Sequence, residues 1–263
     1  MFNFDFFGDW KLKKIIIICK RPTRIEKKLA VFFNAWLMDQ IPDQTADVFH
    51  RSGDKPYTIH AEATSSELKF IVSLLKEKKV QEITTFFDNF SKDKIVFNSV
   101  NEEFKIRQIK KEECSEKDLT ERFYQEDAAR IFNLDFISPT AFKSQNSFIF
   151  LPDIRLIFQS LMRKYEYVFS DTDHVDVELL DQIIQSTRIK HFKIKSEYYS
   201  IHQAFIPGFK GKIKLSCSGP QTLVNYVNLL LKFGEYAGIG VKTGLGMGAV
   251  LVNQDRKKDG ENG

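Results

Sequence analysis

Hydrophobic residues in the first half of this chain alternate between strand and helix spacing. Residues 12–19 include four consecutive isoleucines, a pattern typical of a strand buried on both faces. Leu29, Phe33, Trp36 and Leu37 then recur at i, i+4, i+7 and i+8, which predicts a helix over residues 29–40. Two strands, a helix and a strand pair are expected next, over residues 57–63, 68–75, 83–90 and 94–109. The order is βαββαβ.

The second half repeats this order. A strand over residues 129–138 and a turn at Pro139 and Thr140 precede a helix that begins at Pro152. The apolar stripe of that helix comprises Ile154, Ile157, Phe158, Leu161, Met162 and Tyr165. An acidic loop and a short helix follow over residues 170–186, and then two strands over residues 189–199 and 205–217. A helix from Pro220 to Gly234 and a final strand complete this half.

This repeated order predicts an α+β protein of two tandem ferredoxin-like (βαββαβ, RRM-like) domains with antiparallel sheets. We expect an N-terminal domain over residues 1–125 and a C-terminal domain over residues 126–254, joined where charged residues dominate, near residues 112–127. The polar, glycine-containing tail at residues 255–263 is expected to be disordered.

One segment fits neither regular pattern, because residues 238–248 hold five of the chain's 13 glycines. Alternation from Leu245 to Leu251 predicts a strand whose other face is bare glycine backbone. Such a face admits a close neighbour, either a packed helix or a phosphate backbone, with Lys242 supplying charge. The segment matches neither a P-loop, because Val241 precedes Lys242, nor a dinucleotide fingerprint, because Thr243 stands at the third glycine position.

Composition adds few constraints to a chain of 263 residues with a formal net charge of +4. The longest apolar run near the N-terminus is too short for a signal peptide or a membrane span, so a cytoplasmic protein that does not contact membranes is expected. Three scattered cysteines, Cys19, Cys114 and Cys217, have no spacing typical of a disulfide framework or a zinc site.

Basic residues alternate with apolar ones along the two strands expected in the second half. Paired as a hairpin, the strands would have an apolar face and a basic face, the basic one comprising His191, Lys193, Lys195, Lys210, Lys212 and Lys214. Such a face suits a phosphate backbone, although a solvated sheet face has the same pattern. Tyr198 and Tyr199 could stack on a base or pack against protein.

Four sequence blocks stand out along the chain: HRSGDKPYT from His50, LDFISPTAF from Leu134, FKGKIKL from Phe209 and AGIGVKTGLGMG near the C-terminus. Together they resemble the CRISPR-associated repeat-processing endoribonucleases of the RAMP superfamily. The resemblance spans nearly the whole chain in consistent order. It implies two ferredoxin-like folds and a glycine-rich loop that contacts RNA through Gly238, Gly240, Lys242, Gly244, Gly246 and Gly248.

The resemblance also implies cleavage of CRISPR repeat RNA without a metal ion or other cofactor. The 2′-hydroxyl next to the scissile phosphate would attack it, leaving a 2′,3′-cyclic phosphate and a 5′-hydroxyl. His50 matches the histidine of the family block and Lys55 its lysine, while His60 is a rival to His50. The first helix lacks the tyrosine of some relatives and offers Asn34 and Trp36 instead.

Two alternatives to this enzyme remain open on the sequence. One is a non-catalytic RNA-binding RAMP subunit of a CRISPR effector complex. A histidine in the HRSGDKPYT block, here His50, favours the enzyme over that subunit. A nucleotide-binding protein is disfavoured by the two failed glycine motifs. Expected partners are therefore repeat RNA and effector-complex subunits, and a homodimer is open because some relatives pair.

Overall fold

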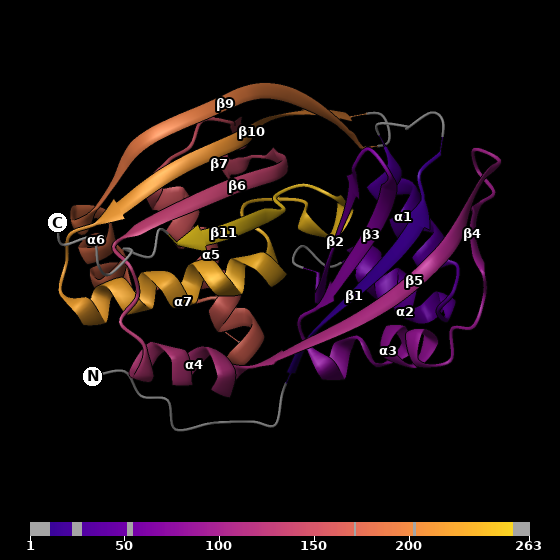
Figure 1. The fold of residues 1–263 in the computed structure, drawn as a ribbon, viewed down its shortest axis with the longest axis horizontal. Helices are drawn as coiled ribbons and strands as arrows, with labels where there is room; N and C mark the ends of the chain where they lie inside the picture. Colours follow the sequence, from indigo (N-terminus) through magenta and orange to yellow (C-terminus); the bar gives the residue numbers. More distant parts are fainter. Residues whose placement is uncertain (1–10, 23–27, 52–54, 171, 202–203, 255–263) are drawn as a thin grey trace, which may run out of the picture.

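The computed structural model describes residues 11–22, 28–51, 55–170, 172–201 and 204–254. Two larger antiparallel sheets, one in each half of the chain, lie side by side and are each covered by helices, and a third sheet has two short strands (Figure 1). Among the described residues, no helix combines the length and apolar content needed to cross a lipid bilayer.

The first sheet has the strand order β2-β3-β1-β5-β4. Its central strand β1 (Lys11–Lys20) pairs antiparallel with both β3 and β5. Ile15, Ile17 and Ile18 are buried and Ile16 is half-buried, so both faces of the isoleucine run are largely covered, as expected. The elements of this half are β1, α1 (Leu29–Met38), α2 (Asp43–Arg51), β2 (Tyr57–Ala63), β3 (Glu67–Leu74), the 3-10 turn η1 (Glu77–Lys79), α3 (Gln81–Asp88), β4 (Lys94–Phe97) and β5 (Glu102–Ser115).

The second sheet has the order β11-β6-β10-β9, in which the last strand of the unit lies beside the first. Two tandem ferredoxin-like units with antiparallel sheets are therefore confirmed as the fold class. The elements of this half are α4 (Glu116–Gln125), β6 (Ile131–Thr140), β7 (Phe142–Ser144), β8 (Ser147–Ile149), α5 (Ile154–Phe169), α6 (Val177–Ser186), β9 (Thr187–Ile201), β10 (Ala204–Cys217), α7 (Gln221–Ala237), the 3-10 turn η2 (Thr243–Leu245) and β11 (Val250–Gln254).

Each sheet packs its helices against a separate apolar core. In the first half, Phe33 of α1 stacks on Phe70 of β3 with ring centroids 4.7 Å apart. In the second half, Phe136 of β6 meets Phe209 of β10 at 4.8 Å, and the expected stripe of α5 is buried beneath the sheet. The cores thus fix α1 and α7, whose ends adjoin the glycine-rich segment.

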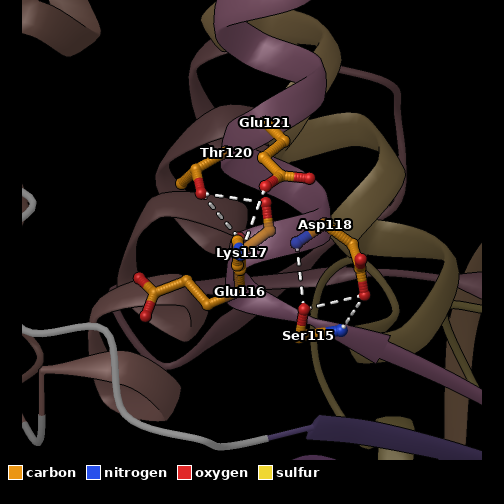
Figure 2. A network of polar contacts seen from close by, with 6 residues as sticks. All are labelled: Ser115, Glu116, Lys117, Asp118, Thr120 and Glu121. Carbon is orange, nitrogen blue, oxygen red and sulfur yellow. Dashed lines mark hydrogen bonds and ion pairs between the residues drawn. The ribbon is translucent and has the colours of Figure 1, made fainter.

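The charged connection between the halves is folded rather than loose. Strand β5 runs to Ser115, and α4 begins there with a capping box that is seen in close-up in Figure 2. The Ser115 hydroxyl accepts a hydrogen bond from the Asp118 backbone N–H at 3.0 Å, while the Asp118 carboxylate accepts one from the Ser115 backbone N–H at 2.7 Å. Leu119 and Phe123 of α4 are buried in the second core. By packing, α4 therefore lies with the second half.

Several local expectations were wrong or incomplete. Pro139 and Thr140, expected as a turn, are the last residues of β6, and α7 continues past Gly234 to Ala237. The sequence patterns did not indicate α2, α4 or the β7–β8 hairpin. Pro42 and the spacing of Ala46 and Phe49 were the available signals for α2, which is too short for a clear apolar stripe. The tail at residues 255–263 lies outside the described residues.

Candidate active site beside the glycine-rich loop

His50 lies in the last turn of α2, where its side chain is exposed to solvent. The preceding residue, Phe49, is buried and packs edge-on against Tyr57 of β2, so the core anchors this turn. Lys55 follows α2 and donates a hydrogen bond from Nζ to the Phe49 carbonyl oxygen. A lysine ammonium at the carbonyl end of a helix is electrostatically favourable. The structure thereby brings His50 and Lys55 to the same end of α2.

Lys55 also joins this helix end to the glycine-rich loop, residues 238–248. The aliphatic part of its side chain lies against Gly244, where an added Cβ would stand 2.5 Å from Lys55 Cδ. Burial, followed by the positive charge of Lys242, lowers the pKa of Lys55 below its ordinary value. The exposed Lys242 is therefore close enough for its charge to act on Lys55. Two segments almost 190 residues apart in sequence form one basic site.

The glycine-rich segment is a loop, and its prediction as a strand with a bare glycine face was wrong. Gly240 and Gly246 have φ of +82° and +105°, values that a β-strand does not adopt, and β11 begins only at Val250. Close neighbours do exist, as expected, but they are protein atoms. A Cβ at Gly240 would collide with the Ala141 carbonyl oxygen, and one at Gly246 with the Tyr199 hydroxyl and Ala30 of α1.

Lys164 of α5 holds the start of this loop and was missed by the sequence analysis. Its Nζ donates hydrogen bonds of 3.0 Å to the carbonyl oxygens of Ala237 and Gly238, where α7 ends, and one of 3.4 Å to the Thr243 hydroxyl. The side chain is buried. A signal was present, because Lys164 stands between Leu161 and Val168 at spacing that otherwise carries apolar residues.

His60, the rival of His50, lies in a different setting on β2. Its Nε2 is 3.1 Å from Glu62 Oε1, and the hydrogen bond from His60 is the largest cause of a lowered pKa of Glu62. The space beside it, lined also by Thr58 and Tyr236, has a volume of about 10 Å³. That space is scarcely enough for one water molecule. His60 is enclosed between the two halves, whereas His50 faces solvent.

Neither residue that the first helix offers in place of a tyrosine is exposed at the site. Asn34 Oδ1 accepts a hydrogen bond of 2.9 Å from the Tyr57 hydroxyl inside the first core. Trp36 is stacked on Phe33 at 5.3 Å and is also buried. Both side chains therefore have structural contacts within the first core.

The basic residues of β9 and β10 form a second, separate surface. In the antiparallel register His191, Lys193 and Lys195 lie opposite Lys214, Lys212 and Lys210, so the two basic rows pair as expected. Lys212 Nζ is 3.8 Å from Asp135 Oδ2 on β6, and Lys195 Nζ is 3.8 Å from Glu197 Oε2, which partly offsets their charge. At roughly 3.3 Å per residue, Lys193 is about 20 Å along β9 from Tyr199, which contacts the loop. The rows therefore extend along the hairpin away from the loop contact at Tyr199.

One expectation for this hairpin needs correction, and one open alternative is narrowed. Phe192 lies on the side assigned to the core, yet it is 60% exposed because β9 is the edge strand of its sheet. The two tyrosines also have different environments. Tyr199 is buried and donates a hydrogen bond of 2.7 Å to the Leu245 carbonyl oxygen, while Tyr198 is 73% exposed. Of the two, Tyr198 has a ring face available to a base.

The site combines an exposed imidazole with two lysines, which suits proton transfer beside an anionic group. Among the described residues, no group of three or more histidine, cysteine or acidic side chains is placed to share a metal ion.

Comparison with known proteins identifies a family. The family model for the CRISPR-associated endoribonuclease Cas6 matches residues 134–250. A protein of that description from Streptococcus thermophilus is 30% identical over 243 residues, which are 92% of this chain and 99% of the relative. One from Mycobacterium tuberculosis (strain CDC 1551 / Oshkosh) is 31% identical over 219 residues, 82% of this chain and 69% of the relative.

Solved structures agree on the fold. A Cas6 product complex has a TM-score of 0.74 at 18% identity, covering 93% of this chain and 100% of the other. Thermus thermophilus Cas6 has a TM-score of 0.71 at 18% identity, covering 92% and 98%. With a close sequence relative over nearly its whole length and this shared fold, the chain belongs to the Cas6 family of CRISPR-associated endoribonucleases.

Proposed function

We propose that this protein cuts CRISPR repeat RNA with His50 and Lys55 beside the glycine-rich loop, without a metal ion. The observation that carries the proposal is the contact of Lys55 with both Gly244 and the end of α2, the helix end that also carries the exposed His50. Relatives named as endoribonucleases support RNA cleavage as the reaction. A solved structure described as a RAMP protein binding different RNA substrates supports RNA as the ligand.

The proposed step is an internal transesterification. His50 takes the proton of the 2′-hydroxyl, the 2′-oxygen bonds to phosphorus, and the bond from phosphorus to the 5′-oxygen breaks. Lys242 offsets the added negative charge of the phosphorane. Lys55, whose pKa is lowered by burial, supplies the proton that the leaving 5′-oxygen needs. The products are a 2′,3′-cyclic phosphate and a 5′-hydroxyl.

We expect cleavage to continue in EDTA and to stop when the 2′-hydroxyl before the scissile phosphate is replaced by hydrogen, because that hydroxyl is the nucleophile. Gel analysis of both RNAs, with end-group mapping of the products, measures this. Loss of activity in EDTA that Mg²⁺ restores would overturn the metal-independent step. Tight binding with no cleavage of either RNA would favour the non-catalytic RNA-binding subunit.

The paired lysines of β9 and β10 are proposed to contact RNA phosphates. Replacing Lys212 and Lys214 by glutamine should weaken binding of the 2′-deoxy RNA and reduce the slope of log K against log[salt] by roughly 1 to 2, because each phosphate contact contributes about 0.7 to 0.9. Fluorescence anisotropy over a salt series gives the slope.

The matched control for that experiment replaces Lys105 and Lys110, which are exposed on β5 of the first sheet. This control also lowers the positive charge of the chain by two, but at positions away from the β9–β10 surface. An equal change of slope in both double variants would show that net charge, rather than the β9–β10 surface, is responsible.

A further inference from the structure

A polar groove lies on the second half, against the glycine-rich loop but outside the site just described. The β7–β8 hairpin, α5 and the first part of the loop, at Gly240 and Val241, line it. Its volume is about 630 Å³, within the range of roughly 300–1,000 Å³ that is usual for ligand sites. A groove of this size has room for single nucleotides and is too small for a double helix.

The walls of the groove present cations and amides over an apolar floor. Lys143 and Arg163 are exposed and supply positive charge from opposite walls, while Gln145, Asn146 and Gln159 supply amide donors and acceptors. Phe142, which is buried, lies below them. None of the described residues that line the groove is acidic. The groove therefore matches a ligand that is anionic, has hydrogen-bonding edges and has flat apolar faces.

The loop wall of the groove is held in place by α5. Gly240 N donates a hydrogen bond of 2.9 Å to Ser160 Oγ, and Val241 N donates one of 2.9 Å to the Ala141 carbonyl oxygen. The same loop lies against Lys55 at Gly244. One fixed segment thus borders the groove at Gly240 and the His50–Lys55 site at Gly244.

We propose that this groove binds unpaired nucleotides of the RNA that flank the cleavage position. The inference rests on the proposed function, because the anionic polymer that reaches Lys55 can continue past Lys242 into the groove. Lys143 and Arg163 bind its phosphates, and the amides of Gln145 and Gln159 bind base edges. These residues do not take part in the chemical step, and they select RNA with a single-stranded extension.

The test asks whether the effect of one variant on RNA binding depends on the length of the RNA. Binding of a non-cleavable 2′-deoxy repeat RNA is compared with binding of RNAs shortened stepwise from each end. We expect Lys143→Glu to weaken binding of the long RNA by about tenfold, the loss of one charge-assisted contact. Removing the flanking nucleotides should weaken RNA binding by the unmodified protein to a similar extent. The variant should bind the long and the short RNAs with equal affinity.

Two further variants make the outcome decisive. Gln159→Ala should reduce the same length dependence without a change of charge, and Lys105→Glu on β5 should retain the full length dependence. Equal weakening of long and short RNAs by Lys143→Glu, or no weakening at all, would overturn the groove proposal. Thermal melting checks that each variant is folded. Failure of the proposed function is a separate result, because it would appear as absence of cleavage by the unmodified protein.

Discussion

Replacement of His50 by alanine is expected to slow cleavage of the repeat RNA by at least about 100-fold, the usual contribution of a general base. The side chain is exposed at the end of α2, so its removal should cost little stability or RNA affinity. Single-turnover cleavage with saturating protein measures the rate, and anisotropy with 2′-deoxy RNA measures binding.

The control for this prediction is His174→Ala, because His174 is also exposed and precedes α6 in the other half of the chain. It should cleave at the rate of the unmodified protein. A normal rate for His50→Ala would contradict the assignment and move the role to His60. That case is tested with the cleavage rate of His60→Ala. Because this variant also loses the contact with Glu62, its stability is measured in parallel by thermal melting.

The second large effect is expected for Gly240→Ala, which should lower the free energy of unfolding by about 2 to 4 kcal/mol. The residue has φ of +82°, and an added Cβ would collide with the backbone oxygen of Ala141, which cannot move without disturbing β6 and β7. Urea denaturation followed by circular dichroism measures the loss.

Gly244→Ala is the matched control in the same loop. Its Cβ would meet the Lys55 side chain, which is flexible, so stability should fall much less while cleavage slows because Lys55 is displaced. Equal destabilisation by both substitutions would contradict this explanation, because it would show that the Lys55 side chain cannot move aside for an added Cβ at Gly244.

The fold could be predicted from the sequence because its elements are long and strongly periodic. The isoleucine run of β1 and the apolar stripe of α5 each indicate one element type, and their repeated order leads to two ferredoxin-like units. Short elements lack this signal. Helix α2 spans nine residues and buries Ala46 and Phe49, too few apolar positions to define a stripe.

The glycine-rich segment shows why local pattern can mislead. Alternation of Leu245, Met247 and Ala249 fits a strand, but the positive φ of Gly246 and the contacts of Gly240 with Ala141 produce a loop instead. The residues that contact these glycines are Ala141 between β6 and β7, Tyr199 of β9 and Ala30 of α1, all far from the loop in sequence. The same holds for the site, because Lys55 and Gly244 meet only through the packing of the two halves.

Because the glycine-rich loop contacts both halves, its length should vary little among related proteins. Residues inserted between Gly238 and Gly248 would displace Ala30 or Lys55, so this interval should keep a fixed length. The turn between β4 and β5 is different, because Asn101 already has φ of +52° there and its side chain is exposed. Insertions and fused peptides are expected to be accommodated at that turn, which makes it the natural position for an affinity tag or a fluorescent label.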